Sequence, residues 1–190
     1  RDVERSRGLG DVYKRQADII LGNKDKSKIV EILNDFIRDR ESKKIIYDLS
    51  SVEFEKMEIS HFDNHTRAFV KIQDGCNAFC SYCIIPYTRG RVRSKNKEDV
   101  IEEVSRLARD GYKEIVLTGI HTGRYGIDIN SSLYELLCEL VKIPNIYRIR
   151  LSSIEINEVT PEIIDLYKNN KIMARHLHVP LQSGSNKILK

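Results

Sequence analysis

Long apolar runs and aromatic side chains are both scarce in this sequence of 190 residues. No stretch approaches the roughly 18 apolar residues that a membrane-spanning helix requires. The first residues also lack the charged, apolar and small-residue regions of a secretory signal. Aromatic residues make up only 7% of the chain, whereas hydrophobic residues make up 41%, which is enough to fill a core. The composition therefore predicts a globular protein without a transmembrane helix, and the cytoplasm is its expected location.

Cysteine is also infrequent, and its placement argues against a disulfide scaffold. The chain has four cysteines, and three of them fall within positions 76–83. A disulfide framework normally spreads an even number of cysteines along a short secreted chain. Clustered thiols in a cytosolic chain instead indicate a metal centre.

No acidic residue occurs between Ile84 and Lys97, although the net charge of the whole chain is only +4. The basic residues of this segment alternate at a period of two: Arg89, Arg91, Arg93, Lys95 and Lys97. In an extended segment they would point one way and form a row of cations that contacts phosphates. The candidate RNA-binding residues are therefore Arg89, Arg91, Arg93 and Lys95. The alternative is a solvated loop in which Arg89 or Arg91 packs near the cysteines.

The first 66 residues divide into three segments by composition. Residues 1–16 carry eight charged residues without a helical or strand period, which predicts an unstructured or foreign leader. Residues 17–40 contain one apolar strand and one amphipathic helix, so they form a strand-helix unit. Residues 41–66 are polar and irregular, which predicts a linker.

From residue 67 to residue 190, short apolar strands alternate with amphipathic helices. Strands are expected within 67–73, 113–120, 146–153 and 176–182. Helices are expected within 97–109, 133–141 and 161–170. Such alternation predicts an α/β fold with a parallel sheet and right-handed crossovers, as in a barrel or a doubly wound fold. A closed barrel needs more strands than these, so we expect part of a barrel.

The loop after the first of these strands has the sequence DGCNAFCSYC, which contains Cys76, Cys80 and Cys83. Thiolates at such short spacing bind one soft metal centre, chiefly zinc or an iron-sulfur cluster. Structural zinc takes four protein ligands. The fourth could be His61, His65 or Cys138, and Cys138 fits better as a core residue of a helix. A cluster held by three cysteines leaves one iron open for a ligand, which is a catalytic arrangement.

The cysteine spacing, its place after a first strand and Tyr82 before the last cysteine together resemble the signature of radical S-adenosylmethionine (SAM) enzymes. The resemblance implies a 4Fe-4S cluster on the three cysteines, with S-adenosylmethionine bound at the open iron and cleaved to a 5′-deoxyadenosyl radical. The longer string FVKIQDGCNAFCSYCIIPYTRGRVRSK, and further matches up to residue 190, resemble the methylthiotransferases. For 67–190 this implies a partial radical-SAM (βα) barrel, preceded in 17–40 by the tail of an α/β N-terminal domain.

Four shorter strings, VKIQDGCN, CSYCIIPYTRG, LTGIHTG and LSSIE, look most like one branch of the methylthiotransferases. That branch converts N6-threonylcarbamoyladenosine beside the tRNA anticodon to its 2-methylthio derivative. The resemblance implies three partners, namely tRNA, a sulfur donor and an electron donor such as flavodoxin or ferredoxin. Branches that act on isopentenyladenosine in tRNA or on a ribosomal-protein aspartate stay alternatives. A zinc-organised RNA-binding module without catalysis is an alternative from another class.

The chain departs from the full-length family in one respect that concerns cofactors. The family's N-terminal domain binds a second, auxiliary 4Fe-4S cluster through three further cysteines, and no cysteine precedes Cys76 here. The later barrel strands and the small RNA-binding domain of the family are also missing. We therefore expect this chain to bind the radical cluster without completing methylthiolation.

The other candidate cofactor contacts lie in the loops that follow the strands, where parallel α/β folds place their chemistry. The expected cofactor contacts are Tyr82, Thr118, Gly119, Ser152, Ser153, Glu155 and Gln182. His121, Ser183 and Gly184 belong to the same loops. For each of these residues the alternative is structural: a surface tyrosine, a simple turn or a helix-entry loop. His176 and His178 share one face of the last strand, where we expect them to line the barrel interior rather than bind a metal.

Overall fold

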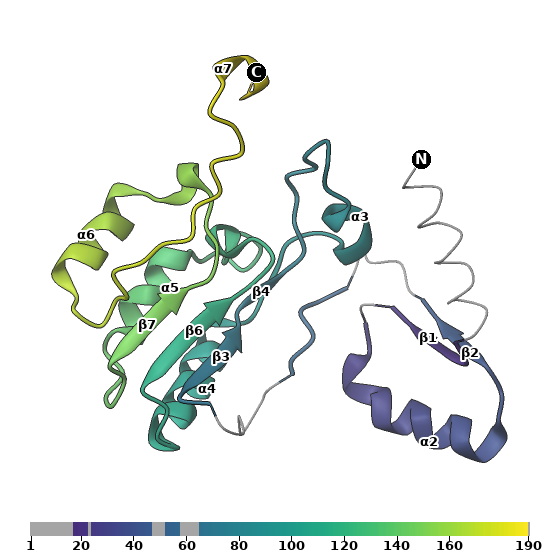
Figure 1. Cartoon of the computed structure of the whole chain (residues 1–190). Coiled ribbons are helices and arrows are strands. Elements are labelled where there is room, and N and C mark those ends of the chain that lie inside the picture. The colour runs from purple at the N-terminus through teal and green to yellow at the C-terminus, as the bar shows by residue number, and fades with distance from the viewer. Residues whose placement is uncertain (1–16, 23, 47–51, 58–64, 190) are drawn as a thin grey trace. The chain divides into compact units, whose positions relative to one another are not determined.

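The computed structural model describes residues 17–22, 24–46, 52–57 and 65–189. The chain divides into two compact units, Arg1–Met57 and Glu58–Lys190, and Figure 1 shows the elements of each. The predicted leader and His61 lie outside the described residues. Among the helices of the described part of the chain, none is long and apolar enough to cross a membrane.

The first unit consists of two short parallel strands and the helix that connects them. Its elements are β1 (Ile19–Leu21), η1 (Lys26–Lys28), α2 (Ile29–Asp39) and β2 (Lys43–Ile45). Strand β2 lies inside residues 41–66, for which the sequence predicts a linker. The sequence does not indicate this strand, because three residues are too few to show a strand period. Both the backbone N–H and the hydroxyl of Ser27 donate to Glu55, at 2.8 and 3.0 Å. Glu55 also belongs to the predicted linker, so this part of the linker packs on the first unit as well.

The second unit is built on a three-stranded parallel sheet. Its strands, in the spatial order β3-β6-β7, are β3 (Arg67–Lys71), β6 (Glu114–Thr118) and β7 (Arg148–Leu151). The register aligns Phe69, Val116 and Arg150 across the sheet. Because the strands are parallel, the loops that follow them meet at one edge of the sheet. This arrangement confirms the predicted α/β fold with parallel strands.

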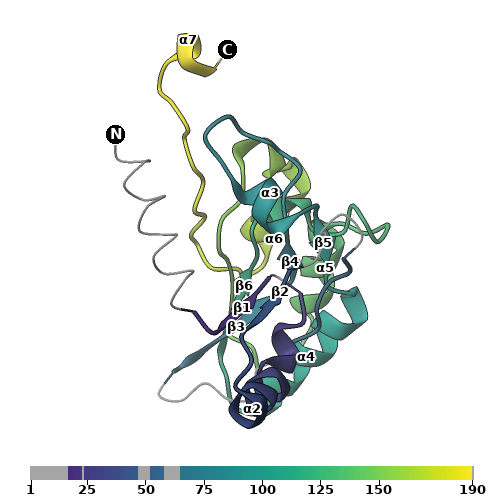
Figure 2. The same ribbon diagram turned by 90° about the vertical axis from the view of Figure 1, so that its right-hand side faces the viewer.

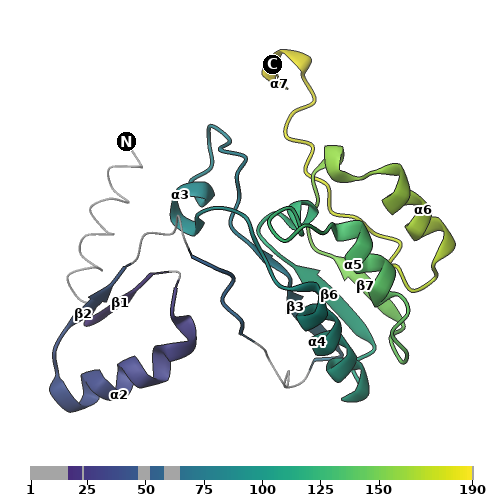
Figure 3. The same cartoon turned by 180° about the vertical axis from the view of Figure 1, so that it is seen from behind.

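Helices cover one face of this sheet, as the view from behind in Figure 3 shows. They are α4 (Lys97–Arg109), α5 (Leu133–Leu140) and α6 (Pro161–Asn169). Each helix begins after a residue whose side chain accepts a backbone N–H of the first turn: Asn96, Ser132 and Thr160. Alternate strand residues such as Val70, Leu117 and Leu151 form the buried core against the helices. This packing fixes the carboxyl edge of the sheet, from which the loops after β3, β6 and β7 emerge.

A small hairpin continues from β3 beyond this edge. Strand β4 (Gln73–Asp74) pairs antiparallel with β5 (Arg93–Ser94), and the loop between them contains α3 (Ile85–Arg89). Figure 2 shows α3 beyond the end of β4. The short helices η2 (Thr122–Arg124) and η3 (Ile156–Glu158) follow β6 and β7. The sequence pattern predicts one strand from 67 to 73, whereas the structure bends it into β3 and β4.

The prediction of a fourth regular strand at 176–182 is wrong. The chain runs beside β7, but it forms only the single bridges Ile149↔Met173 and Ser153↔His178. Pro180 has no backbone N–H to donate to a ladder, which favours a broken pairing of this kind. The segment then leads to α7 (Asn186–Leu189). His176 and His178 are both exposed along it.

Candidate active site

The three cysteines of the predicted cluster lie on the loop between β4 and β5. All three thiols are free, Cys80 is exposed, and Cys76 and Cys83 are half-buried. The base of the loop is closed by the backbone, since the N–H of Cys76 donates to the carbonyl of Gly90 at 3.0 Å. Gly75 has a φ of 75°, and a Cβ at this position would overlap the carbonyl of Arg91. Only glycine fits there, because the two arms of the hairpin approach so closely.

The donor set of this loop fits an iron-sulfur cluster chemically. Three thiols within eight residues are the ligands that such clusters use, and none of them is engaged in a disulfide. Within the described residues, no three His, Cys, Asp or Glu side chains already converge into a ligand set. The loop nevertheless supplies the right ligands at the right spacing along the chain, and Cys76, Cys80 and Cys83 are the residues that would hold the cluster.

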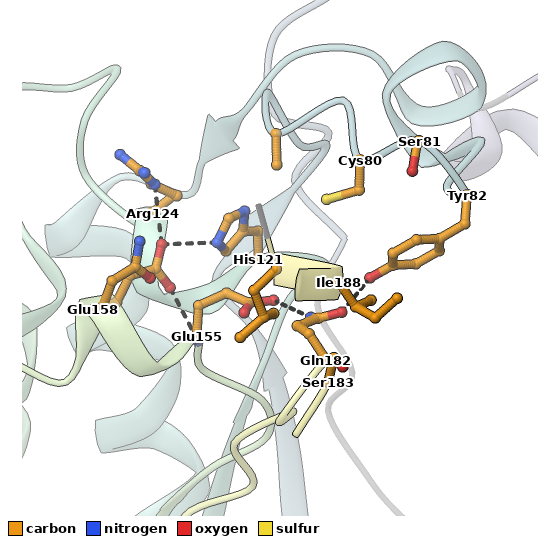
Figure 4. Close-up of a pocket in the computed structure, with 13 residues that line it drawn as sticks. Cys80, Ser81, Tyr82, His121, Arg124, Glu155, Glu158, Gln182, Ser183 and Ile188 are labelled. Atoms are coloured by element: carbon orange, nitrogen blue, oxygen red, sulfur yellow. Dashed lines mark hydrogen bonds and ion pairs between the residues drawn. The ribbon is translucent and has the colours of Figure 1, made fainter. Parts of the chain in front are cut away.

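A pocket of about 500 Å³ opens beside the cysteine loop, at the carboxyl edge of the sheet (Figure 4). Its size is in the range of small-molecule sites. Residues that line it include Cys80, Tyr82, His121, Glu155, Gln182 and Ser183. The hydroxyl of Tyr82 donates to Oε1 of Gln182 at 2.6 Å, and Nε2 of Gln182 lies 3.5 Å from Oε1 of Glu155. The structure thus brings together three of the predicted cofactor contacts from three different loops.

The other four predicted contacts do not line this pocket. The hydroxyl of Thr118 donates to the carbonyl of Val70 at 3.3 Å within the sheet. Gly119 packs against the side chain of Gln73, and the carbonyl of Ser153 accepts from the hydroxyl of Thr122. The hydroxyl of Ser152 is buried and has no hydrogen-bond partner among the described residues. A cofactor role for these four residues stays a prediction.

Two charged residues that the sequence does not single out, Arg124 and Glu158, complete the site. Nδ1 of His121 lies 3.2 Å from Sγ of Cys76, and Nε2 lies 2.7 Å from Oε1 of Glu158. Nε of Arg124 is 3.0 Å from the same carboxylate oxygen. Burial alone would raise the pKa of Glu158, but the close contact with His121 and the charge of Arg124 hold it below its usual value. No local sequence pattern marks the contacts of Glu158 with His121 and Arg124, because both of these residues belong to the loop after β6 and are far from it in the chain.

The comparisons with known proteins agree with this geometry. Residues 70–190 match the family model described as the radical SAM superfamily. The chain belongs to this superfamily. Radical SAM proteins use a 4Fe-4S cluster and S-adenosylmethionine, which are the cofactors that the sequence predicts for the three cysteines and the loops around them.

Curated relatives of this radical SAM chain are methylthiotransferases. It is 41% identical over 181 residues to "Threonylcarbamoyladenosine tRNA methylthiotransferase MtaB" of Aquifex aeolicus, covering 93% of this chain and 43% of the relative. It is 39% identical over 178 residues to "Ribosomal protein uS12 methylthiotransferase RimO" of Clostridium botulinum, covering 92% and 40%. The chain spans about two fifths of the length of these relatives.

A solved structure supports the fold of the radical SAM unit. The methyltransferase TsrM from Kitasatospora setae superposes with a TM-score of 0.52 at 21% sequence identity, covering 65% of this chain and 23% of that one. At this level of identity the likeness concerns the fold alone. It agrees with an α/β fold built on parallel strands.

The structure does not place the five basic residues after the cysteines in one exposed row. Arg89 belongs to α3, and Arg91 is exposed on the loop. Arg93 is buried 3.5 Å from Asp74, and Lys95 is buried 2.6 Å from Glu103. The expected geometry is therefore wrong, because Arg93 in β5 and Lys95 directly after it both point inward toward acidic partners. RNA contact by Arg89 and Arg91 stays a prediction.

The fourth ligands considered for zinc do not gather near the radical SAM cysteines in the described residues. His65 is exposed and comes just before β3 in the chain. Cys138 lies on α5, where it is half-buried. It is therefore less buried than the core position that its helical register predicts.

Proposed function

We propose that this protein is a radical SAM tRNA methylthiotransferase that converts N6-threonylcarbamoyladenosine beside the anticodon to its 2-methylthio derivative. The observation that carries the proposal is the three-cysteine loop beside a pocket, in a chain 41% identical to a threonylcarbamoyladenosine tRNA methylthiotransferase. Two further relatives of that name, from Bacillus subtilis and Thermotoga maritima, are also 41% identical.

The residues of the cysteine loop and of the pocket have distinct tasks in this proposal. Cys76, Cys80 and Cys83 bind the cluster, which when bound supplies the electron that cleaves S-adenosylmethionine. Tyr82 is 75% exposed, so its ring can offer an aromatic face on which an adenine stacks. The carboxylate of Glu155 can accept hydrogen bonds from a ribose or an ammonium group. Gln182 bridges Tyr82 and Glu155, and so sets the spacing of these two contacts.

The reaction also requires partners that complete the chemistry. A base in the anticodon loop can leave its stack to reach a pocket of this kind, so tRNA is the proposed substrate. Sulfur insertion requires a sulfur donor, and reduction of the cluster requires an electron donor such as flavodoxin or ferredoxin. Because tRNA is the proposed substrate, we also propose the cytoplasm as the site of action.

The second candidates are two related substrates, dimethylallyladenosine in tRNA and the ribosomal protein uS12. The sequence identities to relatives with these names are only slightly lower than the 41% quoted above. The chain is 37% identical over 175 residues to a tRNA-2-methylthio-N(6)-dimethylallyladenosine synthase of Acetivibrio thermocellus. The 39% identity to a ribosomal protein uS12 methylthiotransferase supports a protein substrate in the same way. A binding competition separates them: we expect an anticodon stem-loop with N6-threonylcarbamoyladenosine to displace both the dimethylallyladenosine stem-loop and a uS12 loop peptide.

The first test of the proposed activity is anaerobic reconstitution with iron and sulfide. We expect about four irons per chain and reductive cleavage of S-adenosylmethionine, both measured against a Cys80→Ala variant that loses them. Stoichiometric zinc, or iron binding that is indifferent to Cys80, would contradict the catalytic assignment. Preferred binding of the dimethylallyladenosine stem-loop or of the peptide would instead move the substrate to the corresponding branch.

A further inference from the structure

Two groups of the chain contact the sulfur of Cys76. The ring nitrogen Nδ1 of His121 lies 3.2 Å from Sγ, and the backbone N–H of Ala78 points to it at 3.4 Å. Cys80, by contrast, is exposed on the rim of the pocket. The first cysteine of the motif is therefore held against the loop that follows β6, 45 residues further along the chain.

The imidazole of His121 is itself held from its far side. Oε1 of Glu158 lies 2.7 Å from Nε2, and the two side chains are only 8% and 11% exposed. The other carboxylate oxygen of Glu158 accepts the backbone N–H of Glu155 at 3.3 Å, so the carboxylate cannot rotate without losing a contact. Arg124 adds its guanidinium 3.0 Å from Oε1. Gly123 makes room for this carboxylate, because a Cβ there would overlap it. The chain from Arg124 through Glu158 and His121 to Cys76 is visible in part in Figure 4.

The backbone is fixed on both sides of the contact by one buried side chain. Oε1 of Gln73 accepts the backbone N–H of His121 at 2.7 Å. Its Nε2 donates to the carbonyls of Asp74 and Gly75, at 2.9 and 2.6 Å. Gln73 therefore ties the residues before Cys76 to the loop that carries His121. The chain's own contacts thus position both ends of the Cys76–His121 contact.

We propose that His121, oriented by Glu158 and Arg124, is a positioning residue that holds Cys76 as a preorganised ligand of the cluster. Cys80 and Cys83 then supply the other two cysteine ligands. Groups that orient metal ligands in this way strengthen binding, and their removal typically weakens metal affinity by roughly 10-fold to 100-fold. A network that fixes the first ligand also lowers the ordering cost of the exposed remainder of the loop. The proposal rests on the cluster of the superfamily and not on the proposed tRNA substrate.

The test uses Cd²⁺ as a thiolate probe, titrated into the reduced, metal-free chain without oxygen and followed by its charge-transfer absorbance. We expect His121→Ala and Glu158→Ala to bind Cd²⁺ about 10-fold more weakly than the unchanged protein. Asn157→Ala is the matched control, because Asn157 lines the same pocket but is not part of the chain of contacts. Its Cd²⁺ affinity should stay unchanged.

Two substitutions at His121 separate positioning from general stability. Gln can place its amide near the position of Nε2, facing Glu158, but it leaves Cys76 without the Nδ1 contact. Asn can place its amide near Nδ1, beside the sulfur. We expect His121→Asn to recover part of the Cd²⁺ affinity and His121→Gln to recover none. The electron paramagnetic resonance spectrum of the reconstituted, reduced cluster should shift in His121→Gln and not in Asn157→Ala.

Two outcomes would overturn the proposal. The first is wild-type Cd²⁺ affinity in His121→Ala and Glu158→Ala. The second is a loss of affinity that follows thermal stability across all variants, which would give His121 and Glu158 a structural role only. Since Cd²⁺ binding involves neither tRNA nor S-adenosylmethionine, either result would leave the proposed methylthiotransferase activity to its own test.

Discussion

Lys95 and Arg93 are placed where a charged side chain is costly unless an opposite charge is close. Lys95 is 2% exposed and its Nζ lies 2.6 Å from Oε2 of Glu103, which is 4% exposed. Arg93 is 7% exposed beside Asp74 and donates to the carbonyl of Arg89 at 2.8 Å. The carboxylate of Asp74 also faces Lys71 at 2.6 Å. These two basic residues therefore stabilise the hairpin and its attachment to α4, whatever the protein binds.

Replacing Lys95 by methionine tests this structural role. The substitution removes the ammonium group that Glu103 faces in the interior, so we expect the free energy of unfolding to fall by about 3–5 kcal/mol. Urea unfolding followed by circular dichroism measures it. The control is Lys142→Met, which removes an exposed ion pair with Glu139 and should leave the free energy of unfolding nearly unchanged. Equal losses in the two variants would show that the buried pair contributes no more than a surface pair.

Among the elements, those with a local apolar period could be predicted from the sequence. The helices α4, α5 and α6 begin where capping residues and amphipathic periods place them, and β3, β6 and β7 follow from short apolar runs. The β4–β5 hairpin and the irregular path beside β7 depend on contacts between distant segments, which no local period reports. The same holds for the site. The cysteines, Tyr82, Glu155 and Gln182 follow from motifs and loop positions, whereas Glu158 and Arg124 join only when two loops meet.

The β4–β5 hairpin is the element that closes the cysteine loop, and Gly75 is its tightest point. Gly75 and Gly111 both have positive φ, 75° and 99°, but a Cβ at Gly111 meets nothing within 4 Å. Alanine at Gly111 should therefore cost only the left-handed strain, about 1–2 kcal/mol. Alanine at Gly75 must also push the Arg91 backbone away, so we expect a larger loss of stability and a lower iron content after reconstitution. Thermal unfolding and iron analysis of both variants measure the difference, and equal effects would contradict the close approach.

Over the whole molecule the excess of positive charge is small, so its position matters more than its sum. Arg91 is exposed on the loop that carries the cysteines, whereas Arg109 is exposed at the end of α4, before β6 begins. The first lies at the carboxyl edge of the sheet and the second at the amino edge, because α4 leads into the start of β6. Under the proposed function, RNA reaches the pocket at the carboxyl edge of the sheet, where Arg91 lies, and not at the amino edge, where Arg109 lies.

Charge reversal at these two sites tests where RNA binds, because both variants change the net charge equally. If phosphates are bound beside the cysteine loop, Arg91→Glu should weaken binding of an anticodon stem-loop and reduce the dependence of log K on log salt by about one. Arg109→Glu should leave that slope nearly unchanged. Fluorescence anisotropy over a series of potassium chloride concentrations measures both. Equal losses would mean that the RNA responds to overall charge alone, and no loss in either variant would remove Arg91 from the proposed RNA-binding surface.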